Sequence, residues 1–182
     1  RLLVTSLESI PNTIRSVISM SAIGLYGPDH DPVKPFEESE PASTDFLGET
    51  CRLWEAGIDP ASVLGKRLVK LRTGIVLANE GGALAEFKKP LRFGVAGILG
   101  TGRQIVSWIH IEDLCRMILY SIENENMQGV FNAVAPNPVS NRELTLSLAR
   151  VSRGKFFVPV RVPSFVLKLM LGQRSIEVLK SA

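Results

Sequence analysis

The 182-residue chain is 45% hydrophobic and 21% charged, with a net charge of +3 and a pI near 9.0. A chain of this length can bury one sizeable core, and its modest, scattered positive charge does not indicate a nucleic-acid partner. No apolar run reaches the roughly 18 uncharged residues of a membrane span. The first residues also lack the apolar core of a signal peptide, so we expect a cytoplasmic protein with no membrane contact.

The two cysteines indicate neither a disulfide framework nor a zinc site. Cys51 and Cys115 lie far apart, and no second Cys or His stands near either of them at the spacing of metal ligands. We therefore expect both to be small core residues.

Strands are predicted where short apolar or β-branched runs end at small or turn-forming residues. Three such runs are residues 14–20, 67–72 and 130–134, and residues 105–111 and 156–162 are also expected to be extended. Apolar residues at helical spacing, with capping and breaking residues, predict helices at residues 2–10, 46–56, 113–122, 140–152 and 163–171. The alternation of strands and helices predicts an α/β fold with a parallel sheet.

Two helix starts carry recognisable caps. Ser140 and Glu143 fit a capping box, in which each side chain satisfies a free backbone amide of the other residue. Asp113 is well placed to cap the start of the helix predicted at residues 113–122. The residues expected in the core include Trp54, Trp108 and the helical stripe Leu114, Met117, Ile118 and Ile122.

The first segment with chemical content follows the strand at residues 14–20. It reads Ser19-Met-Ser21-Ala-Ile-Gly-Leu-Tyr26-Gly27, and hydroxyls at the carboxyl end of a parallel strand lie where such sheets bind ligands. The alternative is a turn that is small and polar for backbone reasons alone. Both interpretations remain open on these residues.

The pattern Ser-x-Ser-Ala-x-x-x-Tyr-Gly resembles the active-site strand of extended short-chain dehydrogenases/reductases, the group that includes sugar-nucleotide epimerases. Further along the chain, residues 71–77, Leu-Arg-Thr-Gly-Ile-Val-Leu, resemble the segment of the same family that passes the nicotinamide. Residues 100–114, with their Trp-Ile-His-Ile-Glu-Asp run, resemble its substrate-side strand and the helix that follows. Together with residues 129–136, this run is similar to one subgroup, the epimerase-family proteins of bacteria and organelles. The resemblance covers nearly the whole chain.

This resemblance implies the later part of a Rossmann-like doubly wound parallel sheet with a small, partial C-terminal substrate-side α/β region. Residues 1–80 would hold later βα units, and residues 81–182 a substrate-side segment with returning strands and a truncated C-terminal domain. The Gly-x-x-Gly-x-x-Gly loop that binds the cofactor's pyrophosphate would lie upstream of Arg1. The similar run at residues 97–102 precedes a strand-like segment instead of a helix, which argues against a phosphate loop.

The family further implies NADP or NAD as the cofactor, a small-molecule substrate that is unidentified, with nucleotide sugars as one candidate class, and a homodimer. By resemblance, Ser21 is the catalytic residue. The cofactor-binding residues would be Ser19, Arg72, Thr73 and Gly74, and the substrate-binding residues Arg103, Trp108 and His110. The residues themselves leave other roles open: a surface ion pair for Arg72, a solvated loop for Arg103 and a packing role for His110. The acidic run at residues 37–40 is expected to be a solvated loop, with no metal site.

One departure concerns proton transfer. The superfamily uses Tyr-x-x-x-Lys, in which the lysine lowers the pKa of the tyrosine, whereas this chain has Asp45 and Glu49 at those positions. Tyr26 and His110 remain as other proton sources. Three alternatives stay open: an NAD(P)-dependent epimerase or oxidoreductase, a regulatory module that binds a dinucleotide without turnover, and a fragment that is inactive by itself.

Overall fold

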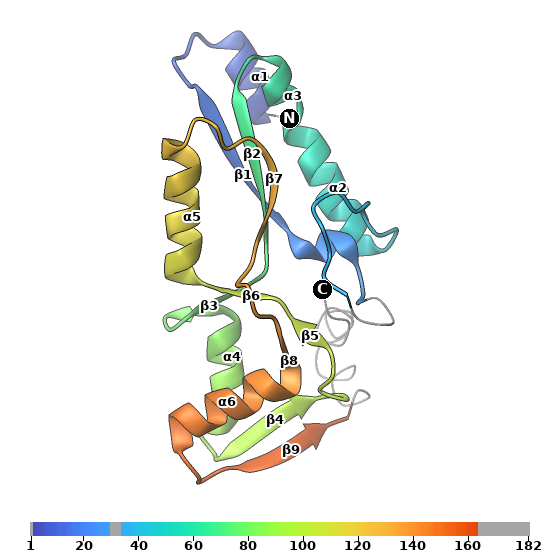
Figure 1. The fold of residues 1–182 in the computed structure, drawn as a ribbon, viewed down its shortest axis with the longest axis vertical. Coiled ribbons are helices and arrows are strands. Elements are labelled where there is room, and N and C mark those ends of the chain that lie inside the picture. Colours follow the sequence, from blue (N-terminus) through green and yellow to red (C-terminus); the bar gives the residue numbers. More distant parts are fainter. Residues whose placement is uncertain (1, 30–33, 164–182) are drawn as a thin grey trace. The chain divides into compact units, whose positions relative to one another are not determined.

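The computed structural model describes residues 2–29 and 34–163 (Figure 1). These residues form two compact units. Of the described residues, the first unit comprises 2–27, 35–74 and 111–133, and the second comprises 28–29, 34, 75–110 and 134–163. The helix predicted at residues 163–171 lies outside the described residues beyond Pro163. Among the described residues, no helix has the length and apolar character needed to cross a membrane.

A three-stranded parallel sheet is the centre of the first unit. Its order is β1 (Ser16–Ala22), β2 (Arg67–Thr73) and β7 (Gly129–Ala133). The three strands predicted from the sequence all form, and their parallel pairing confirms the α/β prediction. Their register places Ser21 opposite Arg72, and Arg72 opposite Asn132, at the carboxyl end of the sheet.

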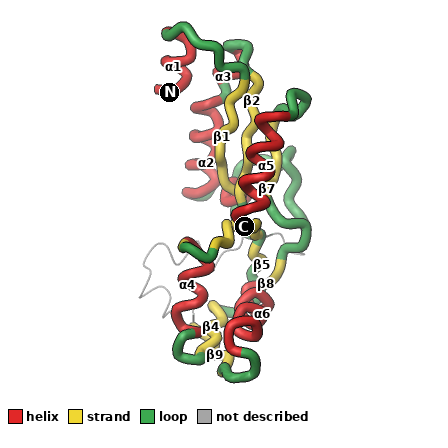
Figure 2. Tube along the Cα trace, turned by 90° about the vertical axis from the view of Figure 1, so that its left-hand side faces the viewer, coloured by secondary structure: helices red, strands yellow, loops and turns green. Residues whose placement is uncertain are grey.

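Helices cover both faces of this sheet. Figures 1 and 2 show α2 (Phe46–Ile58) on one face and α5 (Ile111–Glu123) on the other. The short elements α1 (Leu2–Ser9), η1 (Ile23–Tyr26) and α3 (Pro60–Val63) complete the unit. One core cluster consists of Leu7, Ile58, Ala61 and Leu68.

The second unit contains three two-stranded pairings. Parallel pairs join β3 (Ile75–Ala78) to β6 (Trp108–His110) and β4 (Val95–Leu99) to β9 (Val158–Val162), and β5 (Ile105–Val106) pairs antiparallel with β8 (Val139–Ser140). Helices α4 (Gly82–Leu91) and α6 (Asn141–Arg153) pack against β4. Leu91, Ala96 and Ala149 form the core cluster where these elements meet.

Two boundary details refine the sequence predictions. The capping box of Ser140 and Glu143 is confirmed at the start of α6. Helix α5 begins before Asp113, whose carboxylate pairs with Arg116 at 3.0 Å in the first turn. The predicted cap is therefore wrong, because the helix already starts at Ile111.

Several residues expected in the core are exposed. Trp54 has 63% of its surface exposed because its neighbour Glu55 takes the position on α2 that faces the sheet. In α5, the fully buried position belongs to Ser121, whose hydroxyl donates to the carbonyl of Met117 at 2.7 Å, and Ile122 is 51% exposed. Cys115 is also exposed, whereas Cys51 is half-buried.

Candidate functional site

Glu55 joins two residues that the parallel register places side by side. The Ser21 hydroxyl donates to Oε1 of Glu55 at 2.8 Å. Nε and Nη2 of Arg72 donate to Oε1 and Oε2 of the same carboxylate at 2.9 and 3.0 Å. Glu55 and Arg72 are only 6% and 7% exposed, so this is a buried, bidentate ion pair.

The remaining Arg72 donor extends the contacts to the next strand. Nη1 donates to the Tyr26 hydroxyl and to the Glu38 carbonyl, both at 2.9 Å. The Tyr26 hydroxyl donates to the side-chain Oδ1 of Asn132 at 2.7 Å, and the backbone N–H of Asn132 donates to Oε1 of Glu38 at 2.8 Å. We call Ser21, Tyr26, Glu38, Glu55, Arg72 and Asn132 the Glu55 network. The acidic loop predicted to be merely solvated is thus tied to the end of the sheet.

A stacked aromatic pair lies beside Arg72 in this network. The rings of Tyr26 and Phe36 stack with their centroids 4.9 Å apart, and the Arg72 guanidinium lies 5.2 Å from the centre of the Tyr26 ring. The cation therefore lies against a ring face, which contributes attraction in addition to its hydrogen bonds. Tyr26 is held on its ring and at its hydroxyl.

The ion pair of Glu55 and Arg72 favours the charged form of both side chains. Burial alone would raise the pKa of Glu55, but the hydrogen bonds from Arg72 and Ser21 outweigh it and hold the pKa below its usual range. Burial opposes the charge of Arg72, and the hydrogen bonds to Glu55 and Tyr26 nonetheless raise its pKa further above the ordinary value. Glu55 therefore stays ionised at neutral pH and holds Ser21 and Arg72 in place instead of accepting a proton.

Thr73 and Gly74, two other sequence-predicted residues, also lie at the carboxyl end of the sheet, whereas Ser19 lies in the middle of β1 opposite Lys70. The Thr73 hydroxyl donates to the Leu71 carbonyl at 3.3 Å, and the Gly74 amide donates to the Ala133 carbonyl at 3.1 Å. Ser19 shares the α2 face of β1 with Ser21 and lines a hollow of about 600 Å³. Their roles toward a cofactor stay predictions.

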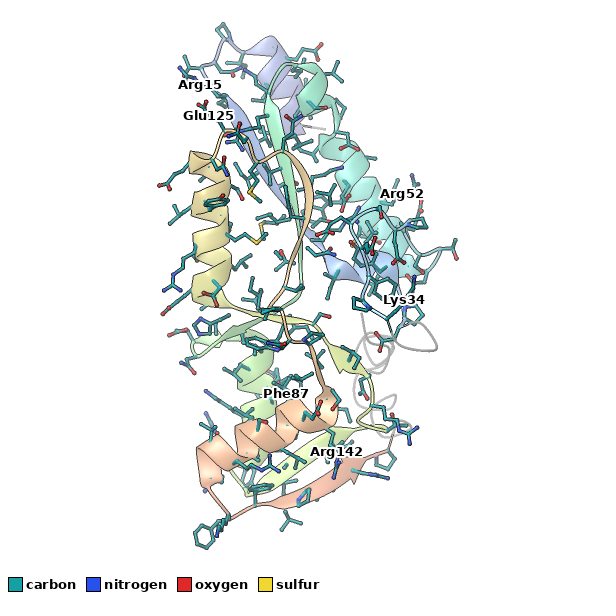
Figure 3. All side chains as sticks on the ribbon, viewed as in Figure 1. Arg15, Lys34, Arg52, Phe87, Glu125 and Arg142 are labelled. Carbon is teal, nitrogen blue, oxygen red and sulfur yellow. The ribbon has the colours of Figure 1, made fainter. Side chains whose placement is uncertain are left out.

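Asp45 and Glu49 have structural partners at the start of α2. Oδ1 of Asp45 accepts a hydrogen bond from the Gly48 amide at 2.9 Å, as an N-cap does. Glu49 forms an exposed ion pair with Arg52 at 2.5 Å, and the hydrogen bond from Arg52 lowers the pKa of Glu49 (Figure 3). Both carboxylates therefore have structural roles in α2, and their correspondence to the superfamily's proton-transfer pair stays a prediction.

In the second unit, the structure brings Arg103 to a cavity of about 470 Å³. The cavity is lined by Thr101, Gly102, Arg103, Ser140, Arg142, Glu143 and Arg161. Trp108 and His110, the other two predicted substrate residues, are not among the lining residues. The Trp108 indole donates to the Asn137 carbonyl at 3.1 Å, and His110 is half-buried on β6 opposite Leu77.

The sequence analysis did not identify Glu55 at the end of the sheet, or Arg142 and Arg161 at the cavity of the second unit. Glu55 could have been found, because it occupies the helical stripe of Cys51 and Ile58, where a charged side chain needs a buried partner. Arg142 and Arg161 gave no such signal, since they are separated from Arg103 by tens of residues and meet only through the pairing of β4 with β9 and the packing of α6.

Comparison with known proteins places the chain in a family. No family model matches the sequence. The chain is 39% identical over 167 residues to the epimerase family protein YfhF of Bacillus subtilis, covering 91% of this chain and 54% of that protein. The chain spans about half the length of the curated relatives that it matches.

Solved structures agree with this match. The human epimerase family protein SDR39U1 (isoform 2), whose structure was determined with NADPH, superposes with a TM-score of 0.86 at 28% identity over 99% of this chain and 60% of that chain. The nucleoside-diphosphate sugar epimerase of Corynebacterium glutamicum gives 0.69 at 36% identity over 92% of this chain and 36% of that chain. The chain therefore belongs to the epimerase family proteins of the extended short-chain dehydrogenase/reductase superfamily.

Proposed function

We propose that this chain is part of a cytoplasmic, NAD(P)-binding, epimerase-like protein that acts on a small molecule, with nucleotide sugars as the candidate substrate class. The observation that carries the proposal is the pairing of Ser21 with Arg72 at the carboxyl end of β1 and β2, both held by Glu55. Open parallel sheets bind their ligands at this end. The NADPH of the human relative's structure and the name of the Corynebacterium relative support the assignment.

The described residues fit one border of a dinucleotide site. Ser19 and Ser21 offer hydroxyls toward the nicotinamide side, and Ser21 keeps lone pairs free to accept while it donates to Glu55. Thr73 and Gly74 would border the cofactor from the next strand. When bound, the cofactor supplies hydride transfer. The chain's own part is to orient the ring and to exclude water from it.

Arg72 would act indirectly in this site. Arg72 donates to Glu55, to the Tyr26 hydroxyl and to the Glu38 carbonyl, so we assign it the positioning of Ser21 and Tyr26 instead of a direct contact with a cofactor phosphate. The similar-looking glycine run at residues 97–102 does not supply the phosphate loop, because it connects β4 to β5 and no helix follows it directly.

Cofactor binding is the first test. The purified full-length protein that contains this chain is titrated with NADPH and with NADH while nicotinamide fluorescence is followed. We expect saturable enhancement with at least one of them, weakened in Ser21→Ala and unchanged in Ser62→Ala, an exposed serine of the same unit. Absence of binding for both nucleotides would overturn the proposal.

A second function is favoured by the roles of Asp45 and Glu49. Asp45 caps α2 and Glu49 pairs with Arg52, so neither side chain replaces the tyrosine and lysine of the usual proton-transfer pair. A regulatory module that binds a dinucleotide without turnover does not need such a pair. This alternative predicts cofactor binding with no exchange of substrate hydrogen. Transfer of deuterium from labelled NADPH or NADH to a nucleotide sugar would exclude it.

A further inference from the structure

A loop that follows β1 in the chain lies across the ends of the other two strands of its sheet. The Glu38 carbonyl accepts a hydrogen bond from Nη1 of Arg72 on β2 at 2.9 Å, and Oε1 of Glu38 accepts one from the backbone N–H of Asn132 on β7 at 2.8 Å. Arg72 and Asn132 are opposite each other in the parallel register. One residue of the loop therefore bonds to two adjacent strands at the end where open parallel sheets bind ligands. We call residues 36–40 the strap.

Phe36 attaches the strap at a second place. Its ring stacks on the Tyr26 ring with an interplanar angle of 6° and centroids 4.9 Å apart. Its carbonyl also accepts from the side-chain amide of Asn132 at 3.3 Å. Tyr26 is only 7% exposed, whereas Glu38 is exposed. The strap is therefore an outer layer between Tyr26 and solvent.

The strap has a fixed shape of its own. Within it, the Glu40 amide donates to the Glu37 carbonyl at 3.0 Å, and the Glu37 amide donates to Oε1 of Glu40 at 3.3 Å. Beyond it, the Ser43 amide donates to the Leu25 carbonyl at 2.7 Å. A segment held in this way loses little conformational entropy when a ligand binds beside it.

The strap also determines which polar groups remain for a ligand at this end of the sheet. Nε, Nη1 and Nη2 of Arg72 each donate to a protein group, and Asn132 is bonded through its backbone N–H, Oδ1 and Nδ2. Ser21 donates to Glu55 but keeps lone pairs that can accept. The strap thus closes the ends of β2 and β7, and the Ser21 hydroxyl on β1 is a group left to contact a ligand.

We propose that Phe36 and Glu38 are positioning residues, which hold the strap closed over the ends of β2 and β7 and so shield a bound nicotinamide ring from water. The inference rests on the proposed function and adds to it an element outside the strands. Shielding matters for hydride transfer, because removing water from a site strengthens the electrostatic interactions there and prevents side reactions. Both residues act through Tyr26, Arg72 and Asn132, and neither needs to touch the substrate.

Hydrogen exchange tests the attachment of the strap without any ligand. The purified full-length protein that contains this chain is compared with Glu38→Ala, which removes the acceptor for the Asn132 amide, and with Glu38→Gln, whose side-chain oxygen can still accept. We expect the amides of residues 36–43 to exchange about tenfold faster in Glu38→Ala, since a charged hydrogen bond is lost, and to be close to wild type in Glu38→Gln.

Glu37→Ala is the matched control for both measurements. This neighbouring carboxylate has the same charge, is exposed on the same loop and bonds to Glu40 through its backbone, so its removal leaves the contacts of the strap with β2 and β7 intact. We expect its exchange rates to equal those of the wild type.

The second measurement is the emission of bound NADPH or NADH at a concentration that saturates each variant. At saturation, the emission depends on how well the nicotinamide is shielded and not on affinity. We expect Glu38→Ala to lose part of the emission enhancement and to be quenched more strongly by acrylamide, with recovery in Glu38→Gln and no change in Glu37→Ala. A merely structural role of Glu38 would lower the stability without changing the emission of the bound ring.

The outcomes separate this inference from the proposed function. Exchange or emission that is the same in Glu38→Ala as in the wild type overturns the inference. Wild-type protein that binds neither nucleotide overturns the proposed function and the shielding with it, and the exchange measurement still shows whether Glu38 holds the strap. Circular dichroism checks folding. If Glu38→Ala is unfolded, Phe36→Leu takes its place with the same expected changes, because it removes the ring stack and keeps the backbone hydrogen bond.

Discussion

Ser21 and Arg72 are register partners on adjacent parallel strands and donate hydrogen bonds to the same carboxylate oxygen, Oε1 of Glu55, at 2.8 and 2.9 Å. The carboxylate comes from α2, so one side chain ties the ends of β1 and β2 to the helix that covers them. The hydroxyl and the guanidinium therefore cannot move independently. This arrangement determines how the first unit responds to substitution and to pH.

Replacing Glu55 by Gln should destabilise the first unit strongly. The amide keeps the shape of the side chain but leaves the buried Arg72 charge without its counter-ion, a change that costs about 3–5 kcal/mol in other buried pairs. Chemical denaturation followed by circular dichroism measures the free energy of unfolding. The control is Glu49→Gln, which removes an exposed pair on the same helix and should have a much smaller effect. Equal losses in the two variants would contradict a buried, structural role for Glu55.

The same pair predicts the acid sensitivity of the fold. Because the folded-state pKa of Glu55 lies below its usual value, the folded state binds this proton more weakly than the unfolded state does. The stabilisation is present above the unfolded pKa of about 4.3 and is lost as the pH falls through the lower, folded value. Unfolding free energies measured from pH 7 down to pH 3 should fall less steeply in Glu55→Gln than in the wild type. Parallel curves for the two proteins would show that other carboxylates dominate.

Much of the first unit could be predicted from the sequence, because its strands are short apolar runs bounded by turns and its helices show apolar residues at helical spacing. Strand β4 in the second unit was not predicted, because its run of residues is interrupted by Gly97 and bounded by Gly94 and Gly100, whose φ values are 74° and 54°. The Glu55 network depends on the register of β1 with β2, and the cavity lined by Arg103 and Arg161 depends on the pairing of β4 with β9. Local patterns contain no information about that register.

Asp45 should behave as a helix cap and not as a proton-transfer residue. Asp45→Ala removes the acceptor for the Gly48 amide and should cost about 1 kcal/mol, whereas Asp45→Asn keeps a capping oxygen and should be nearly neutral. Thermal unfolding of the two variants gives the comparison. NADPH affinity should be unchanged in Asp45→Asn. An Asn variant as unstable as the Ala variant would mean that the negative charge matters more than the hydrogen bond.

Gly102 lies in the turn between β4 and β5, and its carbonyl accepts a hydrogen bond from the Arg142 amide at the start of α6. Its φ of 72° favours glycine, and a Cβ added there would lie 2.5 Å from Cγ2 of Ile98 and 3.1 Å from Cβ of Arg142. Ile98 is a buried β-branched side chain with little freedom to move, so the turn itself must shift. We therefore expect Gly102→Ala to displace this turn from the start of α6 and to destabilise the second unit.

Gly65→Ala is a matched control for this substitution. Gly65 has the same φ of 72°, but a Cβ added there meets nothing within 4 Å, so both variants bear the same backbone strain and only one adds a steric contact. Backbone strain of this kind costs of order 1–3 kcal/mol, and overpacking should add about 1–3 kcal/mol in Gly102→Ala alone. Chemical denaturation of both variants measures the two effects. If Gly102→Ala is no less stable than Gly65→Ala, then the close approach of the turn to α6 does not restrict the residue at position 102.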